Sequence, residues 1–420
     1  MVTRSNGSGT LPGRRSPIGQ ALKGTVMAQG VTLLATPFLT RLYGPAAIGE
    51  YFAVLAACLI VSSVATLRFD VAMQRSELRE VRAATGAALL NGIAVAALAG
   101  TVGVLVQPLL PHVPGLGWLV LTYCTVMAVQ QVVTALLLRG ERHAALSGNR
   151  VAINGLIVLL QLFGTAIGPS AVTLLLSDVA GRLLALLFVL PAALKVAGLP
   201  DLNWCAYLTT LRRERDLLRF ATPATLLNNA TVYALPVTLA LAYPAVLVGQ
   251  VAMTQKLVSL PLAVIGQALG QVYLTGAIQH LNRAPAARYA HLLKFMRLLT
   301  GMALTLLAVI PFAPALFGTV LGSEWTEAGR YYQLLAVAYA AQFIVNPVSQ
   351  TLNLHAAERL QFAWDAVRFT VVAVVLLGGP AIGLGITTVL GVYSAVMTVA
   401  YLVLLVLSAR VVRHTPGEAT

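Results

Sequence analysis

Residues 174–190, LLLSDVAGRLLALLFVL, form an apolar run that contains one aspartate and one arginine, Asp178 and Arg182. With its apolar flanks the run is long enough to cross the hydrocarbon core of a bilayer, which is about 30 Å thick. In a helix, residues four apart share a face, so the two side chains are predicted to pair. An unpaired charge would cost about 2.5–3.5 kcal/mol at the membrane centre. The pair therefore indicates a helix that faces a bundle interior or a cavity, as a structural lock or as part of a substrate site.

Similar apolar runs recur along the whole chain. Of its 420 residues, 58% are hydrophobic and only 10% are charged, whereas about a quarter of the residues of a soluble domain are charged. Lipid cannot satisfy open backbone groups, so the spanning segments must be helical. The composition predicts an all-α integral membrane protein with about twelve transmembrane helices. We place them at 18–41, 46–67, 84–107, 117–138, 151–169, 171–194, 219–242, 245–275, 295–318, 330–350, 363–382 and 384–408.

The basic residues predict the orientation of these spans. All but four of the 28 Lys and Arg residues fall in the tails or in alternate breaks between spans, with Arg359 and Arg368 assigned to one such break. This distribution follows the positive-inside rule, so both termini are expected in the cytoplasm. The net charge of +14 is spread over short clusters, which argues against nucleic acid as a partner. The four exceptions are Arg41, Arg182, Lys256 and Arg330.

The longest basic break lies at mid-chain and divides six predicted spans from six. We predict a disordered cytoplasmic tail at 1–17, an N-terminal six-helix lobe at 18–194, a cytoplasmic linker at 195–218, a C-terminal six-helix lobe at 219–409 and a cytoplasmic tail at 410–420. Within the linker, WCAYLTTLRRERDLL (204–218) is predicted to form an amphipathic helix at the membrane surface. The halves share a weak repeat in which two prolines eight residues apart precede a glycine: Pro37, Pro45 and Gly49, then Pro236, Pro244 and Gly249. Parallel repeats of this kind are typical of transporters, with the site between the halves.

Polar side chains form stripes at helical spacing on several predicted spans. Such stripes serve either as contacts between helices or as the walls of a watery cavity, and the sequence leaves both readings open. Lys256 has no carboxylate one turn away, so its expected surroundings are polar side chains, water or an anionic ligand. A cavity with fixed positive charge favours an anionic substrate. The candidate cavity residues are Gln29, Thr36, Asp178, Arg182, Asn229, Lys256 and Gln267.

No cofactor or metal site is predicted. The three cysteines, Cys58, Cys124 and Cys205, form neither a CxxC motif nor a cluster with histidine, so neither a metal site nor a disulfide framework is implied. The chain has no GxxxxGK[ST] loop, so it is not expected to hydrolyse a nucleotide by itself. An enzymatic activity is therefore not the expected function.

Three stretches resemble one transporter family. RLYGPAAIGEYFAVLAACLIVSSVATLRFDVAM (41–73) is similar to the start of bacterial Wzx-type polysaccharide-repeat flippases, in the MOP superfamily that also holds MATE transporters and peptidoglycan-precursor flippases. Its R-L-Y-x-P-x-x-x-G part contains Arg41, Tyr43, Pro45 and Gly49, and its L-R-[FY]-[DE]-x-A part contains Leu67, Arg68, Phe69, Asp70 and Ala72. The stretches VGQVAMTQKLVSLPLAVIGQALGQVYL (248–274) and LFGTVLGSEWTEAGRYYQLLAVAYAAQFIVNPVSQTL (316–352) also look like this family.

The resemblance implies a MATE-like fold of two six-helix lobes in the bacterial cytoplasmic (inner) membrane. It also implies transfer of an undecaprenyl-pyrophosphate-linked oligosaccharide between leaflets by alternating access, for O-antigen or lipopolysaccharide biosynthesis. The lipid-linked oligosaccharide and the bilayer are then the expected partners, with the polymerase and chain-length proteins of the pathway as further candidates. A proton or sodium ion is the candidate coupling ion, with Asp178 as its site. We expect the pyrophosphate to meet Lys256, with Arg182 or Arg68 as a second contact, and Arg68 and Asp70 to form a gate at the cytoplasmic mouth.

Three alternatives remain. A MATE-like ion-coupled exporter of small cations would need exposed carboxylates in the cavity, and the spans offer few beyond Asp178. A membrane glycan polymerase or glycosyltransferase usually carries a substantial outer loop, whereas PHVPGLG (111–117) contains only a single histidine, His112. A peptidoglycan-precursor flippase usually carries extra spans and different early motifs.

Overall fold

The computed structural model describes residues 17–75, 77–215, 217–280, 284–354 and 357–414, which contain helices and no strand. The predicted tails at 1–17 and 410–420 lie largely outside these described residues. We call the helices before residue 200 the N-terminal lobe. Its elements are α1 (Pro17–Leu42), α2 (Pro45–Ser62), α3 (Phe69–Arg75), α4 (Leu78–Val106), α5 (Leu116–Arg139), α6 (His143–Gly164) and α7 (Ala171–Ala197).

A short helix, α8 (Trp204–Arg213), leads to the second half of the chain, which we call the C-terminal lobe. Its elements are α9 (Thr222–Ala242), α10 (Ala245–Gln279), α11 (Pro285–Ala308), α12 (Ala313–Leu321), α13 (Thr326–Leu354), α14 (Glu358–Ala381) and α15 (Ile386–His414). Ten of the described helical segments are long and apolar enough to cross a membrane. Five of these segments lie in each lobe, and α1 and α13 bring the number of long helices in each lobe to six. The chain is a multi-pass membrane protein.

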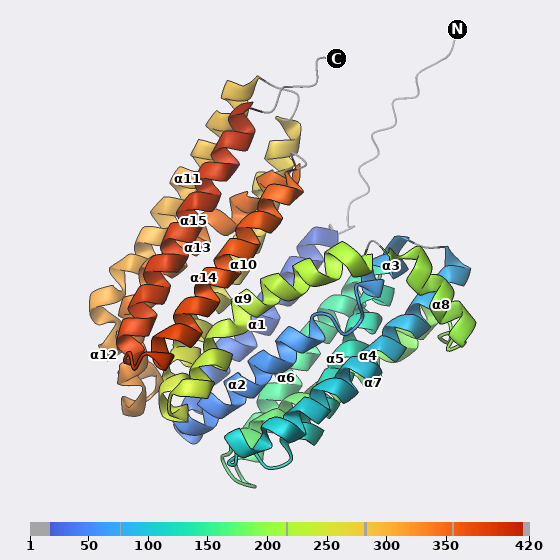
Figure 1. The fold of residues 1–420 in the computed structure, drawn as a ribbon, viewed down its shortest axis with the longest axis horizontal. Helices are drawn as coiled ribbons and strands as arrows, with labels where there is room; N and C mark the ends of the chain where they lie inside the picture. The colour runs from blue at the N-terminus through green and yellow to red at the C-terminus, as the bar shows by residue number, and fades with distance from the viewer. Residues whose placement is uncertain (1–16, 76, 216, 281–283, 355–356, 415–420) are drawn as a thin grey trace.

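The two lobes lie side by side and diverge toward the end of the molecule that carries both termini, α3 and α8 (Figure 1). Within the N-terminal lobe α4 packs on α5, and α6 packs on both α1 and α7. Within the C-terminal lobe α13 packs on α10 and α15, and α9 packs on α14. The lobes meet mainly where α2 contacts α9 and α10. We call the end with the termini the basic end, because Arg139, Arg212 and Arg213 lie there in the last turns of α5 and α8.

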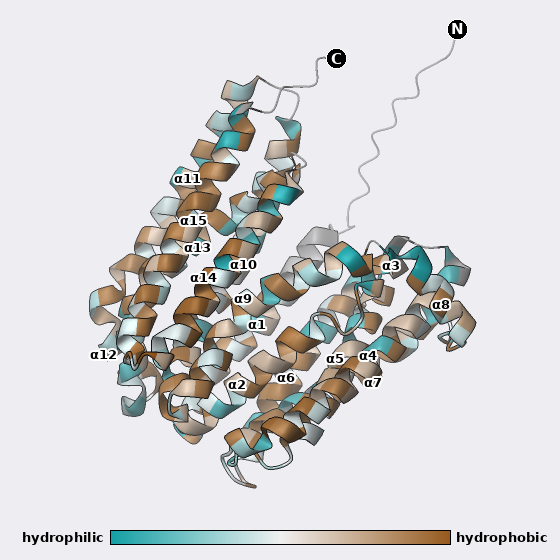
Figure 2. Ribbon diagram, viewed as in Figure 1, coloured by the Kyte–Doolittle hydropathy of each residue, from teal (hydrophilic) through white to brown (hydrophobic). Residues whose placement is uncertain are grey.

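Apolar residues cover the middle of the helices, and hydrophilic residues gather toward their ends (Figure 2). Large side chains such as Leu34, Phe163, Phe188 and Val374 are exposed along the long helices. In water such surfaces would be unfavourable, but a bilayer provides an apolar solvent for them. This pattern agrees with helices that are surrounded by lipid.

The second span ends earlier than predicted. The sequence predicts one span over 46–67, but α2 stops at Ser62 and a series of turns leads to α3 at Phe69. Leu67 and Arg68 have φ values of 48° and 62°, in the left-handed region that is unfavourable for residues with a Cβ. Phe69 and Ala72 are buried in the core of the lobe. Packing of these two side chains holds the turn and redirects the chain into α3.

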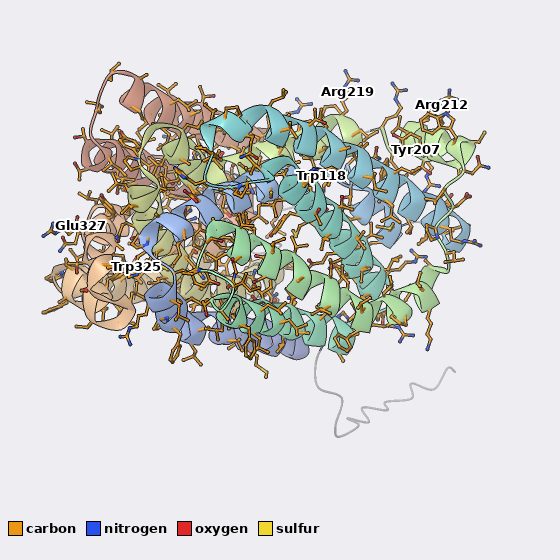
Figure 3. The ribbon with its side chains drawn as sticks, turned by 90° about the horizontal axis from the view of Figure 1, so that it is seen from below. Trp118, Tyr207, Arg212, Arg219, Trp325 and Glu327 are labelled. Atoms are coloured by element: carbon orange, nitrogen blue, oxygen red, sulfur yellow. The ribbon has the colours of Figure 1, made fainter. Side chains whose placement is uncertain are left out.

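The linker helix lies against the N-terminal lobe at the basic end. Asn203 caps α8, its side chain accepting a hydrogen bond from the backbone nitrogen of Cys205 at 2.9 Å. Tyr207 donates a hydrogen bond to Asn91 of α4 at 3.0 Å, and Arg213 pairs with Glu80 of the same helix. The helix ends at Arg213, before the predicted limit at residue 218. Figure 3 shows Arg212 and Arg219 projecting outward from this region.

Candidate functional site

A group of charged and polar side chains lies inside the N-terminal lobe, between α2, α5 and α7. Arg182 Nε is 2.5 Å from Asp178 Oδ1, which confirms the predicted contact within α7. Tyr51 of α2 donates a hydrogen bond to the second carboxylate oxygen of Asp178 at 2.8 Å. Arg182 Nη1 donates to Gln130 of α5 at 3.1 Å, and its guanidinium lies 5.4 Å from the ring centre of Tyr123. Both oxygens of the carboxylate are engaged, as expected of a structural ion pair.

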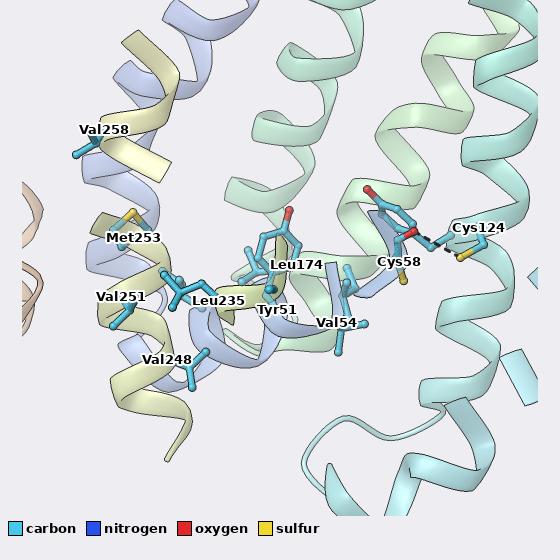
Figure 4. Close-up of a cluster of buried hydrophobic side chains, with 14 of the residues drawn as sticks. Tyr51, Val54, Cys58, Cys124, Leu174, Leu235, Val248, Val251, Met253 and Val258 are labelled. Atoms are coloured by element: carbon cyan, nitrogen blue, oxygen red, sulfur yellow. Dashed lines mark hydrogen bonds between the residues drawn. The ribbon is translucent and has the colours of Figure 1, made fainter. Parts of the chain in front are cut away.

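The surroundings of this group are apolar and closely packed. Figure 4 shows Tyr51 beside Leu174, and Cys58 of α2 beside Cys124 of α5. The Cys124 thiol lies 4.0 Å from the carbonyl oxygen of Cys58, and both cysteines are buried. Because little water reaches this region, the attraction between Asp178 and Arg182 is strong. The pair therefore fixes α7 against α2 and α5.

Lys256 lies on α10, on the side of the C-terminal lobe that meets α2. Its Nζ is 5.5 Å from the ring centre of Phe52, the residue next to Tyr51. Within the described part of the chain, the ammonium group has no hydrogen bond and no ion pair. The charge of Asp178 is already balanced by Arg182, so Lys256 adds a positive charge that has no anion of its own.

The other predicted cavity residues do not join this group. Thr36 is fully buried in α1 and donates a hydrogen bond to the carbonyl of Thr32 at 2.8 Å. Asn229 donates to the carbonyl of Thr225 on its own helix, α9, at 2.9 Å. Gln29 is partly buried, and its side-chain oxygen has no hydrogen-bond donor among the described residues. Gln267 is exposed on α10, eleven residues beyond Lys256.

The predicted gate residues lie together in the turn region between α2 and α3. Arg68 Nη1 is 4.0 Å from Asp70 Oδ2, and both side chains are partly exposed. The Thr66 hydroxyl donates to Asp70 Oδ1 at 3.2 Å. Asp70 also lines a cavity of about 180 Å³ against α5. The structure places these residues at the basic end, and their role as a gate stays a prediction.

A second polar group lies in the C-terminal lobe, and the sequence analysis missed it. Arg368 was assigned to a basic break at the membrane surface, and this assignment was wrong: the residue is inside α14, with 6% of its surface exposed. It lies 2.9 Å from Asp365 one turn away and donates to Asn228 of α9 at 3.2 Å. Its guanidinium also lies 4.3 Å from the ring centre of Trp364. The i, i+3 spacing of Asp365 and Arg368 was the available signal for this pair.

The contact between α2 and α10, which joins the two lobes, brings together the two glycines of the sequence repeat. A Cβ atom on Gly49 of α2 would lie 2.0 Å from the carbonyl oxygen of Ala245. A Cβ atom on Gly249 of α10 would lie 1.9 Å from the carbonyl oxygen of Pro45. The two helices therefore touch backbone to backbone, and only glycine fits at either position. The repeat in the sequence thus marks a symmetric contact.

Hydrogen bonds at the same end join the last turn of α1 to the segment formed by α12 and the start of α13. Trp325 is fully buried and donates from Nε1 to the carbonyl of Thr40 at 3.0 Å. The Thr40 hydroxyl donates to the carbonyl of Leu321 at 3.0 Å, and Arg41 donates to the carbonyl of Thr319 at 3.1 Å. We call the Gly49–Gly249 contact together with these hydrogen bonds the lobe junction. It lies opposite the basic end, so the lobes are joined there and diverge toward the termini (Figure 1).

Comparison of the whole structure with solved proteins identifies the fold. No family model matches the chain, and no curated protein matches it at the level of sequence. The lipid II flippase MurJ, in an inward closed conformation, matches with a TM-score of 0.69 over 94% of this chain and 89% of the other, at 10% identity. A MOP superfamily transporter from Pyrococcus furiosus matches with a TM-score of 0.57 over 96% and 98%, at 15% identity.

A MATE transporter from Vibrio cholerae matches with a TM-score of 0.57 over 94% of this chain and 95% of the other, at 13% identity. The matches cover nearly the whole length of each protein. The chain therefore has the fold of the MOP superfamily, which confirms the fold predicted from the sequence. At these identities the likeness shows the fold alone.

Proposed function

We propose that the protein is a flippase that moves an undecaprenyl-pyrophosphate-linked oligosaccharide repeat unit across the bacterial cytoplasmic membrane. The observation that carries the proposal is the ammonium group of Lys256, which lies within a membrane-spanning helix without a carboxylate partner of its own. A charge in that position is costly unless it faces water or an opposite charge. A pyrophosphate group supplies that opposite charge.

The position of Lys256 fits the path of a substrate between the lobes. It is two turns of α10 beyond Gly249, on the side of the lobe junction that faces the basic end. Farther along the same helix, Ser259 and Gln267 are exposed. In the proposed cycle the pyrophosphate binds at Lys256, the sugars occupy the space between the lobes, and the polyprenyl chain stays in lipid. Opening of the lobe junction then releases the head group on the other side of the membrane.

The proposed orientation places the basic end in the cytoplasm. Basic residues of α8 and of the following segment project outward at this end (Figure 3), as the positive-inside rule requires of a cytoplasmic surface. The structure then represents a state that is closed toward the outside. Undecaprenyl-pyrophosphate-linked sugars are made on the cytoplasmic side in the proposed pathway, so this state is the one that would load substrate.

Flipping in proteoliposomes tests the proposal. The probe is a fluorescent undecaprenyl-pyrophosphate-linked oligosaccharide, and its transfer is followed by quenching with a membrane-impermeant reagent. We expect Lys256→Ala to lower the rate at least tenfold, because loss of one charge-assisted contact is worth about 1.5–3 kcal/mol. Lys256→Arg keeps the charge and should retain most of the rate. Wild-type rates for Lys256→Ala would contradict the proposal.

A matched control is Lys195→Ala. Lys195 lies in the last turn of α7 and is exposed, outside the proposed path. Its removal takes away the same charge from the protein without touching the site, so the rate should stay within about twofold of the wild type, as expected for a surface charge. If the flipping rate fell to a similar extent in both variants, the effect would come from the net charge of the protein and not from Lys256.

A MATE-like exporter of small molecules is the second candidate. It is supported by the structural match with a MATE transporter, which covers nearly the whole of both chains. Such an exporter of organic cations needs an available carboxylate. Asp178 is already held by Arg182 and Tyr51, and Asp365 is held by Arg368. Uptake of ethidium into proteoliposomes under a proton or sodium gradient, with no transfer of the lipid-linked probe, would favour the exporter over the flippase.

A further inference from the structure

The cavity between α3 and α5 has the properties of a separate binding site. Its volume is about 180 Å³, which is below the roughly 300–1,000 Å³ of pockets for drug-sized ligands. It therefore suits one small ring. Its lining consists of four amide or hydroxyl side chains, one carboxylate and three apolar side chains: Gln74, Gln130, Gln131, Thr134, Asp70, Met127, Ala135 and Leu138.

The early end of α2 creates this cavity. Met127, Gln131, Thr134 and Leu138 are three or four residues apart along α5 and share one face of that helix. A straight continuation of α2 beyond Ser62 would run along α5, but the chain turns away into α3 instead. Arg139 fixes the new position by donating to the carbonyl of Met73 at 2.8 Å. The chain after α2 covers part of this α5 face, where Gln131 donates to the carbonyl of Ser62 at 2.7 Å, and the cavity lies beside that contact.

Two polar groups on the α5 side of the cavity are available to a ligand. The Thr134 hydroxyl has no hydrogen bond among the described residues, whereas Thr122 and Thr125 of the same helix each bond to a carbonyl four residues earlier, at 2.8 Å. The amide oxygen of Gln130 accepts from Arg182, which leaves its NH₂ group as a donor. Asp70 lines the same cavity. Hydrogen-bond donors and acceptors therefore surround a small space.

We propose that this cavity binds a single pyranose ring of the sugar head group, through its hydroxyl groups. Amide, hydroxyl and carboxylate groups together donate to and accept from sugar hydroxyls, and Met127 and Leu138 offer an apolar wall for the C–H face of the ring. A free cation fits less well, because Asp70 already lies 4.0 Å from Arg68 and accepts from Thr66.

The inference rests on the proposed function and adds to it a site that distinguishes between sugars. The cavity lies near the last turn of α5, at the basic end, where the head group would enter. Gln130 lines the cavity and also binds Arg182, so one side chain connects the sugar site with the buried ion pair. The sugar ring would therefore bind in this cavity, and be selected there, before the pyrophosphate reaches Lys256.

Thiol labelling tests the site without any transport step. In a Cys205→Ser background, where the remaining cysteines Cys58 and Cys124 are buried, we introduce Thr134→Cys on one wall and, in a second protein, Gln74→Cys on the other. The full-length protein in nanodiscs is treated with a water-soluble maleimide. The probes are free glucose, galactose, N-acetylglucosamine and rhamnose, with open-chain sorbitol as the comparison.

At least one pyranose should slow labelling of both cysteines about threefold when its concentration is twice its Kd, by mass action. Sorbitol should not, and Lys195→Cys, exposed at the end of α7 and outside the cavity, should label at the same rate with and without sugar. No protection by any pyranose, or a cavity cysteine that does not label at all, would overturn the proposal. Protection without any flipping of the lipid-linked probe would instead remove the proposed function and keep the sugar site.

Discussion

At the scale of single residues, the buried Asp178–Arg182 pair determines how the N-terminal lobe is held together. Both side chains are largely excluded from solvent, with 4% and 16% of the side-chain surface exposed. Forming such a pair costs desolvation of both charges, and their attraction offsets that cost only when each has good partners. Tyr51 and Gln130 supply the additional hydrogen bonds. The protein should therefore lose more stability when one member of the pair is removed than when both charges are removed.

This sensitivity gives a stability prediction. Arg182→Ala leaves a buried carboxylate without its cation and should lower the free energy of unfolding by about 3–5 kcal/mol. The double variant Asp178→Asn with Arg182→Ala should recover part of this loss, because no charge remains buried. Unfolding by a denaturing detergent, followed by circular dichroism, measures both values.

The exposed pair Arg330–Glu327 provides the control for this experiment. It has the same chemistry, but 63% and 46% of the two side chains are exposed. Arg330→Ala should change the free energy of unfolding by roughly 0–1 kcal/mol. Equal losses for Arg182→Ala and Arg330→Ala would show that burial of the first pair contributes nothing.

The candidate site could be predicted in part from the sequence. The contact of Asp178 with Arg182 follows from helical spacing alone, and the absence of a nearby carboxylate on the Lys256 helix was also visible. The partners Tyr51 and Gln130 could not be predicted, because they come from α2 and α5 and depend on how three helices pack. Arg368 was misassigned because it was grouped with Arg359 as a charge of a basic break, although the predicted span 363–382 already contains it.

At the scale of helices, the interruption after α2 is the feature that hydropathy could not detect. The residues 63–68, SVATLR, continue the apolar run of the span and contain neither glycine nor proline. The chain nevertheless turns there through two residues with positive φ, Leu67 and Arg68. The reason is tertiary: Phe69 and Ala72 gain burial against the lobe. Local sequence rules cannot show such a gain, whereas the twelve long helices could be predicted from composition and length.

The glycine contact of the lobe junction yields a prediction about conformation. Gly49→Ala places a Cβ against the backbone of α10, so the lobes should move apart at this end. Spin labels at Ile167→Cys and Ile382→Cys, in exposed turns of the two lobes at the junction end, report the separation by pulsed electron resonance in a Cys205→Ser background. The mean distance should increase in Gly49→Ala.

Gly266→Ala is the matched control on α10, because a Cβ at Gly266 meets no atom within 4 Å. Its distance distribution should be that of the unmodified protein. An unchanged distribution in Gly49→Ala would mean that the close approach of α2 and α10 does not hold the lobes together.

At the scale of the whole molecule, both ends of the described chain lie at the basic end, which we propose to be cytoplasmic. Cys205 is exposed on α8 at this end, while Cys58 and Cys124 are buried. A membrane-impermeant maleimide should therefore label the protein in inverted membrane vesicles and not in intact spheroplasts. The positive-inside rule, counted over the short basic segments, is the physical reason.

A cysteine at Ile167, in the Cys205→Ser background, should show the reverse pattern because it lies at the opposite end. Labelling of Cys205 from outside intact spheroplasts would reverse the proposed orientation and, with it, the assignment of the loading state. The fold itself would be unaffected by that result.

The mutual contact of Gly49 and Gly249 also has a genetic consequence. The atom that meets a new Cβ at either position is a main-chain oxygen, which no amino-acid exchange at the facing position can remove. A strain that carries a larger residue at position 49 therefore has no local revertant other than glycine. Suppressors should instead arise at other residues of the lobe junction, such as Thr40 or Trp325, where a change would alter how firmly the two lobes are joined.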